Sequence, residues 1–259
     1  MDSPILIGFL ASLVAGAATG LGGLALWFTG RPTAEQQKLM LGFSAGVMLA
    51  ASFFSLIIPG IEHAQSLGAS RPGAALTIVA AVLLGAFTLA AMHRHVPVDH
   101  IEMLGRPGID PLDVKRIWLF VIAITLHNFP EGMAVGVSFG TGDFGAGMTT
   151  AVGIGVQNIP EGLAVAVSVL TLGYSRMAAF LIAFASGLVE PIGGLFGAGL
   201  AWLSSALLPW GLGFAAGAMI YVVATEIIPE TQRPKPSPRA STGLMIGLAA
   251  MMFLDVSMG

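Results

Sequence analysis

Eight apolar stretches, each about as long as a membrane-spanning helix, divide this chain of 259 residues. A helix needs roughly 20 predominantly apolar residues to cross the hydrocarbon core of a bilayer. The composition agrees, because 55% of the residues are hydrophobic, 10% are charged and the mean hydropathy is +0.86. We therefore predict an all-α, polytopic membrane helix bundle with eight transmembrane helices in one transmembrane domain, residues 1–259, with spans at about 4–28, 39–62, 72–92, 116–138, 145–170, 176–203, 207–230 and 241–258.

The basic residues are distributed unevenly among the connections. Ten of the eleven Lys and Arg residues follow the first, third, fifth and seventh predicted spans, and only Arg71 lies on the other side. Cytoplasmic loops carry an excess of Lys and Arg, so these connections are predicted to be cytoplasmic and both termini to lie outside. The longest of them, the polar loop 93–115, contains His93, His95 and His100. These histidines suit a loop metal site and solvated side chains equally well.

Two neighbouring spans contain the same polar sequence. His127-Asn128-Phe129-Pro130-Glu131-Gly132, the first cassette, recurs thirty residues later as the second cassette, Gln157-Asn158-Ile159-Pro160-Glu161-Gly162. Residues four apart share a helix face, so His127 points the same way as Glu131, and Gln157 the same way as Glu161. The next span adds Glu190 before a proline. A carboxylate at a helix centre costs about 2.5–3.5 kcal/mol on insertion scales, so three consecutive spans that each hold one indicate a shared cationic partner.

Charge and ligand type indicate which cation. Three carboxylates cannot all stay ionised in a dry site, whereas one divalent ion reduces the charge to −1 and two bring it to +1. One imidazole with carboxylate and amide oxygens suits Zn²⁺, Fe²⁺, Mn²⁺, Cd²⁺ and Co²⁺. The chain has no cysteine for a tight structural zinc site. A single Asn or Gln in a span is more often an interhelical hydrogen-bonding residue, so the prediction depends on the whole set.

Other polar residues lie along the predicted spans. Met48, Ser52 and Ser55 follow one face of the second span, and Glu62 lies at its outer end. In the seventh span a pair of carboxylates shares a face at the cytoplasmic end, and Asp255 lies near the outer end of the last span. Each residue alone also suits a core or interfacial position. We predict a metal pathway through Ser52, Ser55, Glu62, Glu226 and Glu230, and Met48 as a candidate ligand.

The cassettes resemble those of the ZIP (Zrt/Irt-like) divalent-metal transporters, most closely the GufA-like branch. The similar segments are the two cassettes, the Gly-Leu-Val-Glu-Pro sequence at 187–191, and residues 41–46, 214–219 and 252–255. The resemblance covers essentially all eight spans. It implies a transporter, not an enzyme, that moves Zn²⁺ and also Fe²⁺, Mn²⁺ or Cd²⁺ into the cytoplasm. It further implies a homodimer in the lipid bilayer of a bacterial inner (plasma) membrane, with metal ions as cargo, no cofactor and no nucleic-acid partner.

The resemblance also assigns ligands by matched position. It implies a mono- or binuclear site, in which one ion is held by His127, Glu131, Gln157 and Glu161, and a neighbouring ion by Asn128, Asn158, Glu161, Glu190 and Met48. Its entrance and exit carboxylates match Glu62 and Glu226. Some GufA-like members have Asp where this chain has Asn158, so the second position lacks one negative charge here.

Two other functions account for part of the pattern. An intramembrane metalloenzyme of the zincin type would need the sequence HExxH and an open coordination position, whereas the first cassette reads HNxxE. A channel, or a proton-coupled carrier of another solute, also accommodates bent helices and buried carboxylates. Uptake by purified protein in liposomes, with metal and pH varied, distinguishes all three.

Overall fold

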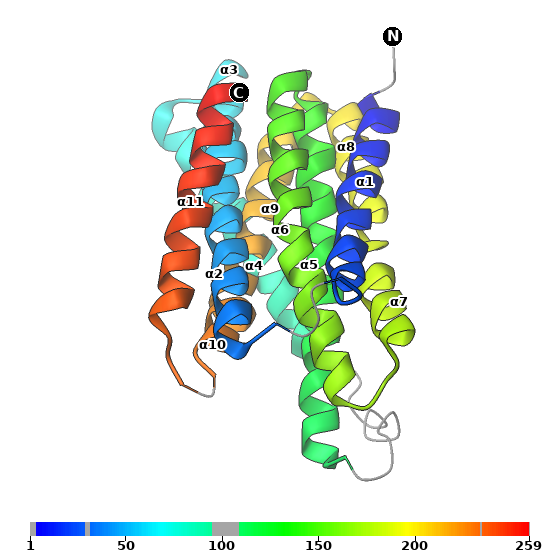
Figure 1. The fold of residues 1–259 in the computed structure, drawn as a ribbon. Helices are drawn as coiled ribbons and strands as arrows, with labels where there is room; N and C mark the ends of the chain where they lie inside the picture. The colour runs from blue at the N-terminus through cyan, green and yellow to red at the C-terminus, as the bar shows by residue number, and fades with distance from the viewer. Residues whose placement is uncertain (1–3, 29–31, 95–108, 234, 259) are drawn as a thin grey trace.

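Eight helical spans lie side by side in the computed structural model, which describes residues 4–28, 32–94, 109–233 and 235–258 (Figure 1). No strand occurs among these residues, so the predicted all-α membrane bundle is confirmed. The helices long and apolar enough to cross a membrane are Pro4–Ala25, Ala34–Ser66, Arg71–Met92, Pro111–Gly140, Phe144–Thr171, Arg176–Leu203, Ser205–Thr231 and Pro238–Ser257.

The spans pack as two groups. The first contains α1 (Pro4–Ala25), α5 (Pro111–Gly140), α6 (Phe144–Thr171), α7 (Arg176–Gly187) and α8 (Glu190–Leu203), with α1 in contact with all the others. The second contains α2 (Ala34–Ala50), η1 (Ala51–Ile57), α3 (Ile58–Ser66), α4 (Arg71–Arg94), η3 (Ser205–Leu207), α9 (Leu208–Val222), η4 (Val223–Ile227), α10 (Ile228–Thr231) and α11 (Pro238–Met258). The groups meet mainly where α5 contacts α9 and α2 contacts α6.

Glycines bring the helices of the first group close together. A Cβ at Gly132 of α5 would collide with the main chain of Glu190, and one at Gly162 of α6 with the main chain of Thr19. Close packing through small residues is typical of membrane helices, which have no hydrophobic driving force for association. Both glycines follow a cassette glutamate, so the helices that carry the cassettes are held tightly against α8 and α1.

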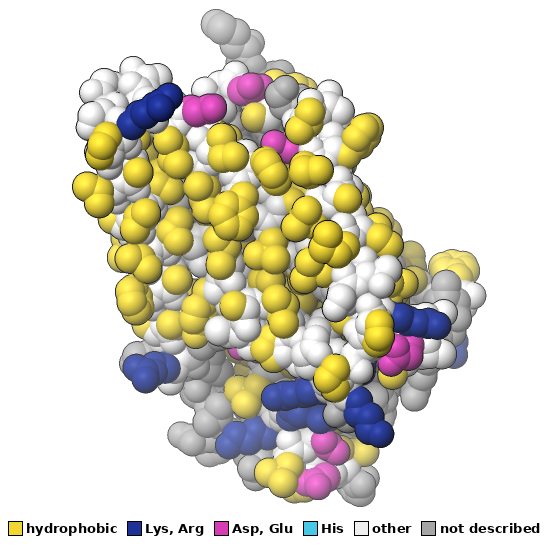
Figure 2. Space-filling view, turned by 90° about the vertical axis from the view of Figure 1, so that its left-hand side faces the viewer, with side chains coloured by type: hydrophobic (Ala, Val, Ile, Leu, Met, Phe, Trp, Pro, Cys, Tyr) yellow, Lys and Arg dark blue, Asp and Glu magenta, His cyan; other side chains and the backbone are white. Residues whose placement is uncertain are grey.

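The two ends of the bundle differ in charge. Both ends of the chain lie at the same end of the bundle (Figure 1). Most of the visible Lys and Arg side chains gather at the opposite end, below a broad apolar surface (Figure 2). The structure therefore places the basic connections together, as the sequence predicted.

The loop expected at 93–115 is shorter in the structure. Residues 93–94 belong to α4, and residues 111–115 form the first turns of α5. The Asp110 side chain accepts a hydrogen bond from the Leu112 amide at 2.9 Å, and Pro111 takes the first helical position, where its missing N–H costs nothing. His95, His100 and the side chain of His93 lie outside the described residues, so the loop metal site stays a prediction.

Three spans depart from regular α-helix. The sixth is interrupted between Gly187 and Glu190, where the sequence places a mid-span Glu-Pro pair. The second and seventh contain the π-helical turns η1 and η4, each just before an Ile-Ile-Pro sequence. These two spans are also similar in sequence, because residues 41–48 and 212–219 are identical at six of eight positions, and they run in opposite directions. π-Helical turns are frequent at functional sites, and inverted repeats are frequent in transporters.

Candidate metal centre

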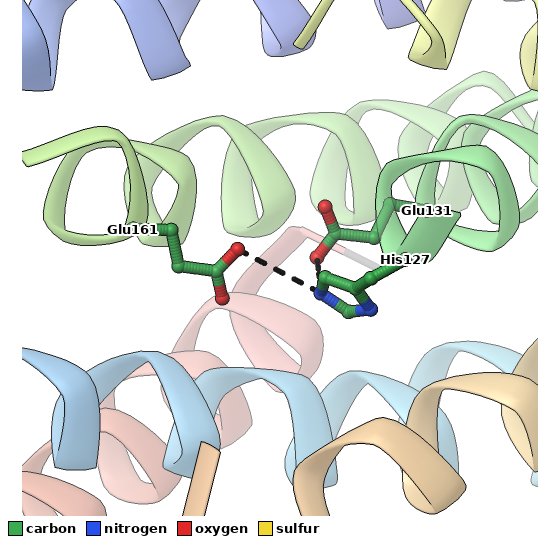
Figure 3. Close-up of side chains that lie close together, drawn as sticks. All are labelled: His127, Glu131 and Glu161. Atoms are coloured by element: carbon green, nitrogen blue, oxygen red, sulfur yellow. Dashed lines mark ion pairs between the residues drawn. The ribbon is translucent and has the colours of Figure 1, made fainter. Parts of the chain in front are cut away.

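The two cassettes face one another inside the bundle. His127 and Glu131 project from α5, and Glu161 projects from α6 toward the same space (Figure 3). His127 Nε2 lies 3.1 Å from Glu131 Oε1 and 3.7 Å from Glu161 Oε2. One candidate ligand atom from each of the three residues lies within 4.8 Å of the other two. Ligands bound to one Zn²⁺ at 2.0–2.2 Å are at most about 4.4 Å apart, so small side-chain movements would allow all three to share an ion.

Local sequence accounts for this arrangement. α5 and α6 both continue through their internal prolines, so the four-residue spacing keeps His127 above Glu131 and Gln157 above Glu161. All four side chains are buried, with at most 1% of their surface exposed. Their burial shields the carboxylates from bulk solvent, and the ion pairs described for them are with His127, not with Lys or Arg.

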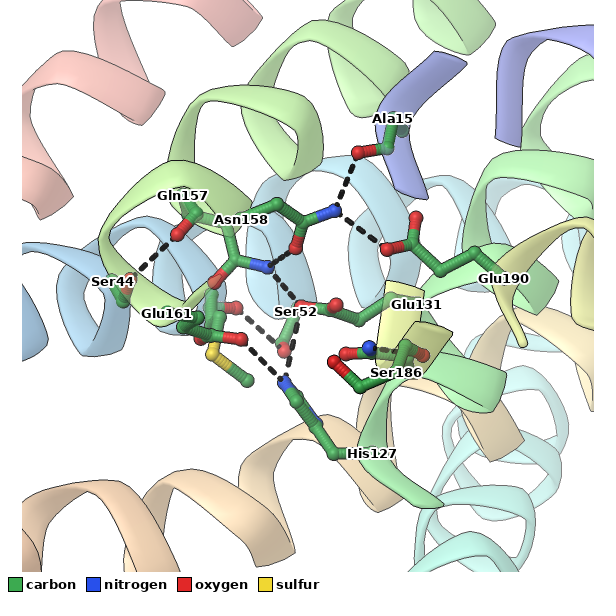
Figure 4. Close-up of polar contacts among 12 residues, drawn as sticks. Ala15, Ser44, Ser52, His127, Glu131, Gln157, Asn158, Glu161, Ser186 and Glu190 are labelled. Atoms are coloured by element: carbon green, nitrogen blue, oxygen red, sulfur yellow. Dashed lines mark hydrogen bonds and ion pairs between the residues drawn. The ribbon is translucent and has the colours of Figure 1, made fainter. Parts of the chain in front are cut away.

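Gln157 connects the cassettes. Its Nε2 donates hydrogen bonds to Glu131 Oε1 and, at 2.9 Å, to Asn158 Oδ1 (Figure 4). Its backbone carbonyl accepts a hydrogen bond from the Ser44 hydroxyl of α2 at 2.9 Å. Because both amide hydrogens of Gln157 are directed at these acceptors, its Oε1 is left over as a neutral oxygen ligand.

The remaining polar residues form a second set next to the first. Asn158 Nδ2 donates to the Ala15 carbonyl at 2.8 Å and to Glu190 Oε1 at 2.6 Å. Asn128 Nδ2 donates to the Ser186 carbonyl at 2.7 Å. Glu190 is the first residue of α8, directly after the interruption of the sixth span. The structure therefore brings together all seven polar residues of the predicted centre in spans four to six.

Many atoms in this cluster have no hydrogen-bond partner. Buried polar atoms are normally satisfied, and those that are not require an explanation such as an ion or a water. The buried atoms of the described chain without a hydrogen-bond partner include His127 Nδ1 and Nε2, Asn128 Oδ1, Glu131 Oε2, Gln157 Oε1, both carboxylate oxygens of Glu161, and Glu190 Oε2. Most of these atoms are oxygen acceptors, and a neutral imidazole adds one nitrogen lone pair, so the set has the chemistry of a cation site.

Three of the candidate residues of the second span, Met48, Ser52 and Ser55, are buried. Met48 is fully buried in the largest hydrophobic cluster. The Ser52 hydroxyl donates to the Met48 carbonyl at 2.8 Å, and the Ser55 hydroxyl donates to Asp255 Oδ1 at 2.7 Å. The two serines are thus held by their own helix and by α11, and the role of Met48 as a ligand stays a prediction.

Two cavities approach the cluster from opposite ends of the bundle. The one at the end that holds the termini measures about 470 Å³ and includes Ser55, Glu62, His63, Asp143 and Asp255 in its lining. The one at the basic end measures about 480 Å³ and includes Lys115, Arg116, Ala123, Glu226, Glu230 and Arg233. Four of the predicted pathway residues therefore line cavities, and Ser52 is buried between them.

Sequence reasoning missed the contributions of three groups. The carbonyls of Ala15 and Ser186 accept the two asparagine amides, and Ser44 holds the backbone of Gln157. Ser44 has a weak signal, since a hydroxyl within an otherwise apolar Gly-Ala segment is conspicuous. Backbone carbonyls have no sequence signal, because every residue carries one.

Comparisons with known proteins agree with this site. The family model described as ZIP Zinc transporter matches residues 113–255, which include both cassettes and Glu190. The chain is 45% identical over 252 residues to the zinc transporter GufA of Myxococcus xanthus, with 97% of this chain and 99% of that protein covered. It is also 45% identical over 243 residues to the zinc transporter ZIPB of Bordetella bronchiseptica, with 94% and 78% covered.

A more distant relative extends the comparison beyond bacteria. The chain is 36% identical over 301 aligned positions to the human zinc transporter ZIP11, with 85% of this chain and 87% of that protein covered. These similarities span nearly the full chain, and the matched region contains the polar cluster built above. The chain therefore belongs to the ZIP zinc transporter family, on its GufA-like branch.

Proposed function

We propose that this protein moves divalent transition-metal cations across a membrane into the cytoplasm, with Zn²⁺ as the main substrate and Fe²⁺, Mn²⁺ and Cd²⁺ as related ones. The observation that carries the proposal is the set of buried, partnerless nitrogen and oxygen acceptors between α5, α6 and α8. The names of the relatives, all zinc transporters, support the same substrate class.

The ion is held by the imidazole of His127, the carboxylates of Glu131 and Glu161, and the amide oxygen of Gln157. Three of these groups offer ligand atoms within 4.8 Å of one another, and the oxygen of the fourth has no hydrogen-bond partner. The set of ligands contains no thiolate, so the ion can be released during each transport cycle. The protein's contribution is to replace the hydration shell of the ion with oxygen and nitrogen ligands at membrane depth.

The route runs between the two cavities. The outer cavity, with Glu62 and Asp255, collects the cation, and the cavity with Glu226 and Glu230 receives it at the basic end. Basic loops are typical of the cytoplasmic side of a membrane protein, which supports a position of both termini outside. Inward transport then runs from the cavity with Glu62 to the cavity with Glu226. On the basis of the family resemblance, the protein is a homodimer in a bacterial inner (plasma) membrane.

Uptake by purified protein tests this function. Liposomes that contain a metal-sensing dye should show uptake of Zn²⁺, with competition from Fe²⁺, Mn²⁺ and Cd²⁺. The matched control is Glu161→Gln, which removes one charge from the centre with little change of shape. Normal Zn²⁺ flux in Glu161→Gln, or no flux with the unmodified protein, would contradict the proposal.

The two rival functions give different results in the same assay. A metalloenzyme would leave the liposome interior free of metal, and a channel would show flux that does not saturate with metal concentration. A proton-coupled carrier would acidify or alkalinise the interior in proportion to the metal taken up. The first outcome excludes the proposed transport of metal, whereas the second and third specify how the metal is moved.

A further inference from the structure

The side chain of Asn158 lies between two negatively polarised oxygens. Its Nδ2 donates to the Ala15 carbonyl at 2.8 Å and to Glu190 Oε1 at 2.6 Å, and its Oδ1 accepts from Gln157 Nε2 at 2.9 Å (Figure 4). These partners fix the direction of the amide. If the amide were rotated by 180°, the oxygen of Asn158 would face a carbonyl and a carboxylate, neither of which has a hydrogen to donate.

This amide occupies a position that would suit a cation. The carbonyl of Ala15 and the carboxylate of Glu190 are both oxygen ligands that divalent ions accept. The N–H groups of Asn158 give these oxygens the positive partner that an ion would otherwise supply. The 2.6 Å separation of Asn158 Nδ2 from Glu190 Oε1 leaves no room for an ion between them, because ligands bound at 2.0–2.2 Å lie farther apart.

A comparison with the first cassette shows that the hydrogen bond from the asparagine amide to a carboxylate occurs in the second cassette alone. Asn128 has the same place in its cassette as Asn158, but its Nδ2 donates to the neutral Ser186 carbonyl and not to a carboxylate. The contact with Glu190 therefore does not follow from the repeated sequence. It arises because the Asn158 side chain of α6 reaches both the Ala15 carbonyl of α1 and the first residue of α8.

Few ligands remain for a second ion. Asn128 Oδ1 and Glu190 Oε2 are buried and without hydrogen-bond partners, but Zn²⁺ normally takes four ligands from its protein or from water. One oxygen of Glu161, shared with the first ion, would bring the number of protein ligands only to three. We propose that the hydrogen bonds of Asn158 take the place of a second cation, so that the centre binds one divalent ion at a time.

The same amide positions a ligand of the ion. Gln157 Nε2 is shared between Glu131 and Asn158 Oδ1, which turns Gln157 Oε1 away from both. Asn158 is thus a positioning residue: it orients Gln157 through one end of its amide and donates a hydrogen bond to Glu190 through the other. This inference rests on the proposed transport function and specifies the stoichiometry of its site.

The test counts bound Zn²⁺ per chain by equilibrium dialysis and elemental analysis of protein in nanodiscs. The unmodified chain should bind one ion, and Asn158→Asp should bind two, because a carboxylate replaces the N–H donor beside Glu190. Glu190→Gln in the unmodified chain should still bind one ion, and Asn158→Asp with Glu190→Gln should return to one. Gln37→Glu, which adds the same charge at the basic end, should leave the count at one.

The outcomes separate the inference from the function on which it rests. Two ions in the unmodified chain, reduced to one by Glu190→Gln, would overturn the inference while leaving the transport site intact. A single ion in folded Asn158→Asp would also overturn it. No bound ion in the unmodified chain would refute the metal site and the inference together. If Asn158→Asp does not fold, the comparison of the unmodified chain with Glu190→Gln still decides the count.

Discussion

The two cassettes share their spacing, their proline and their glutamate, yet they contribute differently to the centre. The first supplies the imidazole of His127, and its Asn128 donates to a neutral carbonyl of α7. The second supplies the neutral amide of Gln157, and its Asn158 donates to a carboxylate and to α1. A repeated sequence has therefore produced two unequal halves: one carries the imidazole, and the other carries the amides that donate hydrogen bonds to Glu131 and Glu190.

The largest effect should come from breaking the feature that the cassettes share. Glu131→Ala and Glu161→Ala should each abolish Zn²⁺ uptake in liposomes, because each removes a carboxylate that faces the His127 imidazole. The loss should exceed the 10–100-fold that removal of an outer hydrogen bond around a metal typically costs. Asp113→Ala, at an exposed ion pair with Arg116, is the control and should transport normally. Near-normal flux in folded Glu161→Ala would remove the basis of the site assignment.

The next effect sharpens the contrast between imidazole and amide. His127→Gln makes the first residues of the two cassettes alike and should weaken Zn²⁺ affinity on the order of 10–100-fold, since a neutral amide oxygen is the poorer ligand for a borderline ion. Gln157→His should instead raise affinity and slow release, so that turnover falls. Calorimetry for binding and liposome uptake for turnover give the two quantities. Equal losses of affinity in both variants would mean that the cassettes are interchangeable.

A smaller effect concerns how closely the helix of each cassette packs against its neighbour. A methyl group at Gly132 would press on the main chain of Glu190, and one at Gly162 on that of Thr19. Overpacking of this kind costs typically about 1–3 kcal/mol, so both alanine variants should have a lower Tm. Gly132→Ala should also reduce metal affinity more than Gly162→Ala does, because it displaces Glu190, a residue of the centre. Gly199→Ala has open space at its Cβ position and is the control. A Tm equal to that of the control in either variant would show that the helices can separate freely.

Sequence alone predicted the spans, the two cassettes and the shared faces of His127 with Glu131 and of Gln157 with Glu161. These features depend on local rules: hydropathy over a helix length and the four-residue helical period. The occurrence of a mid-span carboxylate in three consecutive spans further predicted that Glu190 belongs to the same centre. The structure brings these residues together, while their individual roles as ligands stay predictions.

The directions of the amides could not be predicted. Asn158 contacts a carbonyl 143 residues away in sequence, and Asn128 contacts one 58 residues away. Two asparagines at the same position of similar local sequences thus have different partners, because tertiary packing against α1, α7 and α8 decides which acceptor each amide meets. The π-helical turns of the second and seventh spans were equally invisible, since nothing in the apolar sequence there distinguishes them from α-helix. The helical start of α5 at Pro111 had a signal, the preceding Asp110, that hydropathy alone overlooks.

The smallest predicted effect, that of pH, separates the cassettes by their proton chemistry. Metal ligands must be deprotonated, so protons and Zn²⁺ compete for the same lone pairs and affinity should fall as pH decreases from about 7 to about 5.5. If one proton is displaced per ion, the fall over this range is at most about 30-fold, because each displaced proton contributes one factor of ten per pH unit. The imidazole lies in the first cassette only, so His127→Gln should flatten the dependence and Gln157→His should steepen it. Calorimetry in two buffers of different ionisation enthalpy measures the number of protons released. An affinity that does not change over this pH range in the unmodified protein would show that the ion is not bound by the imidazole and carboxylates. The same slope of affinity against pH in all three proteins would instead assign the released proton to the carboxylates that both cassettes share.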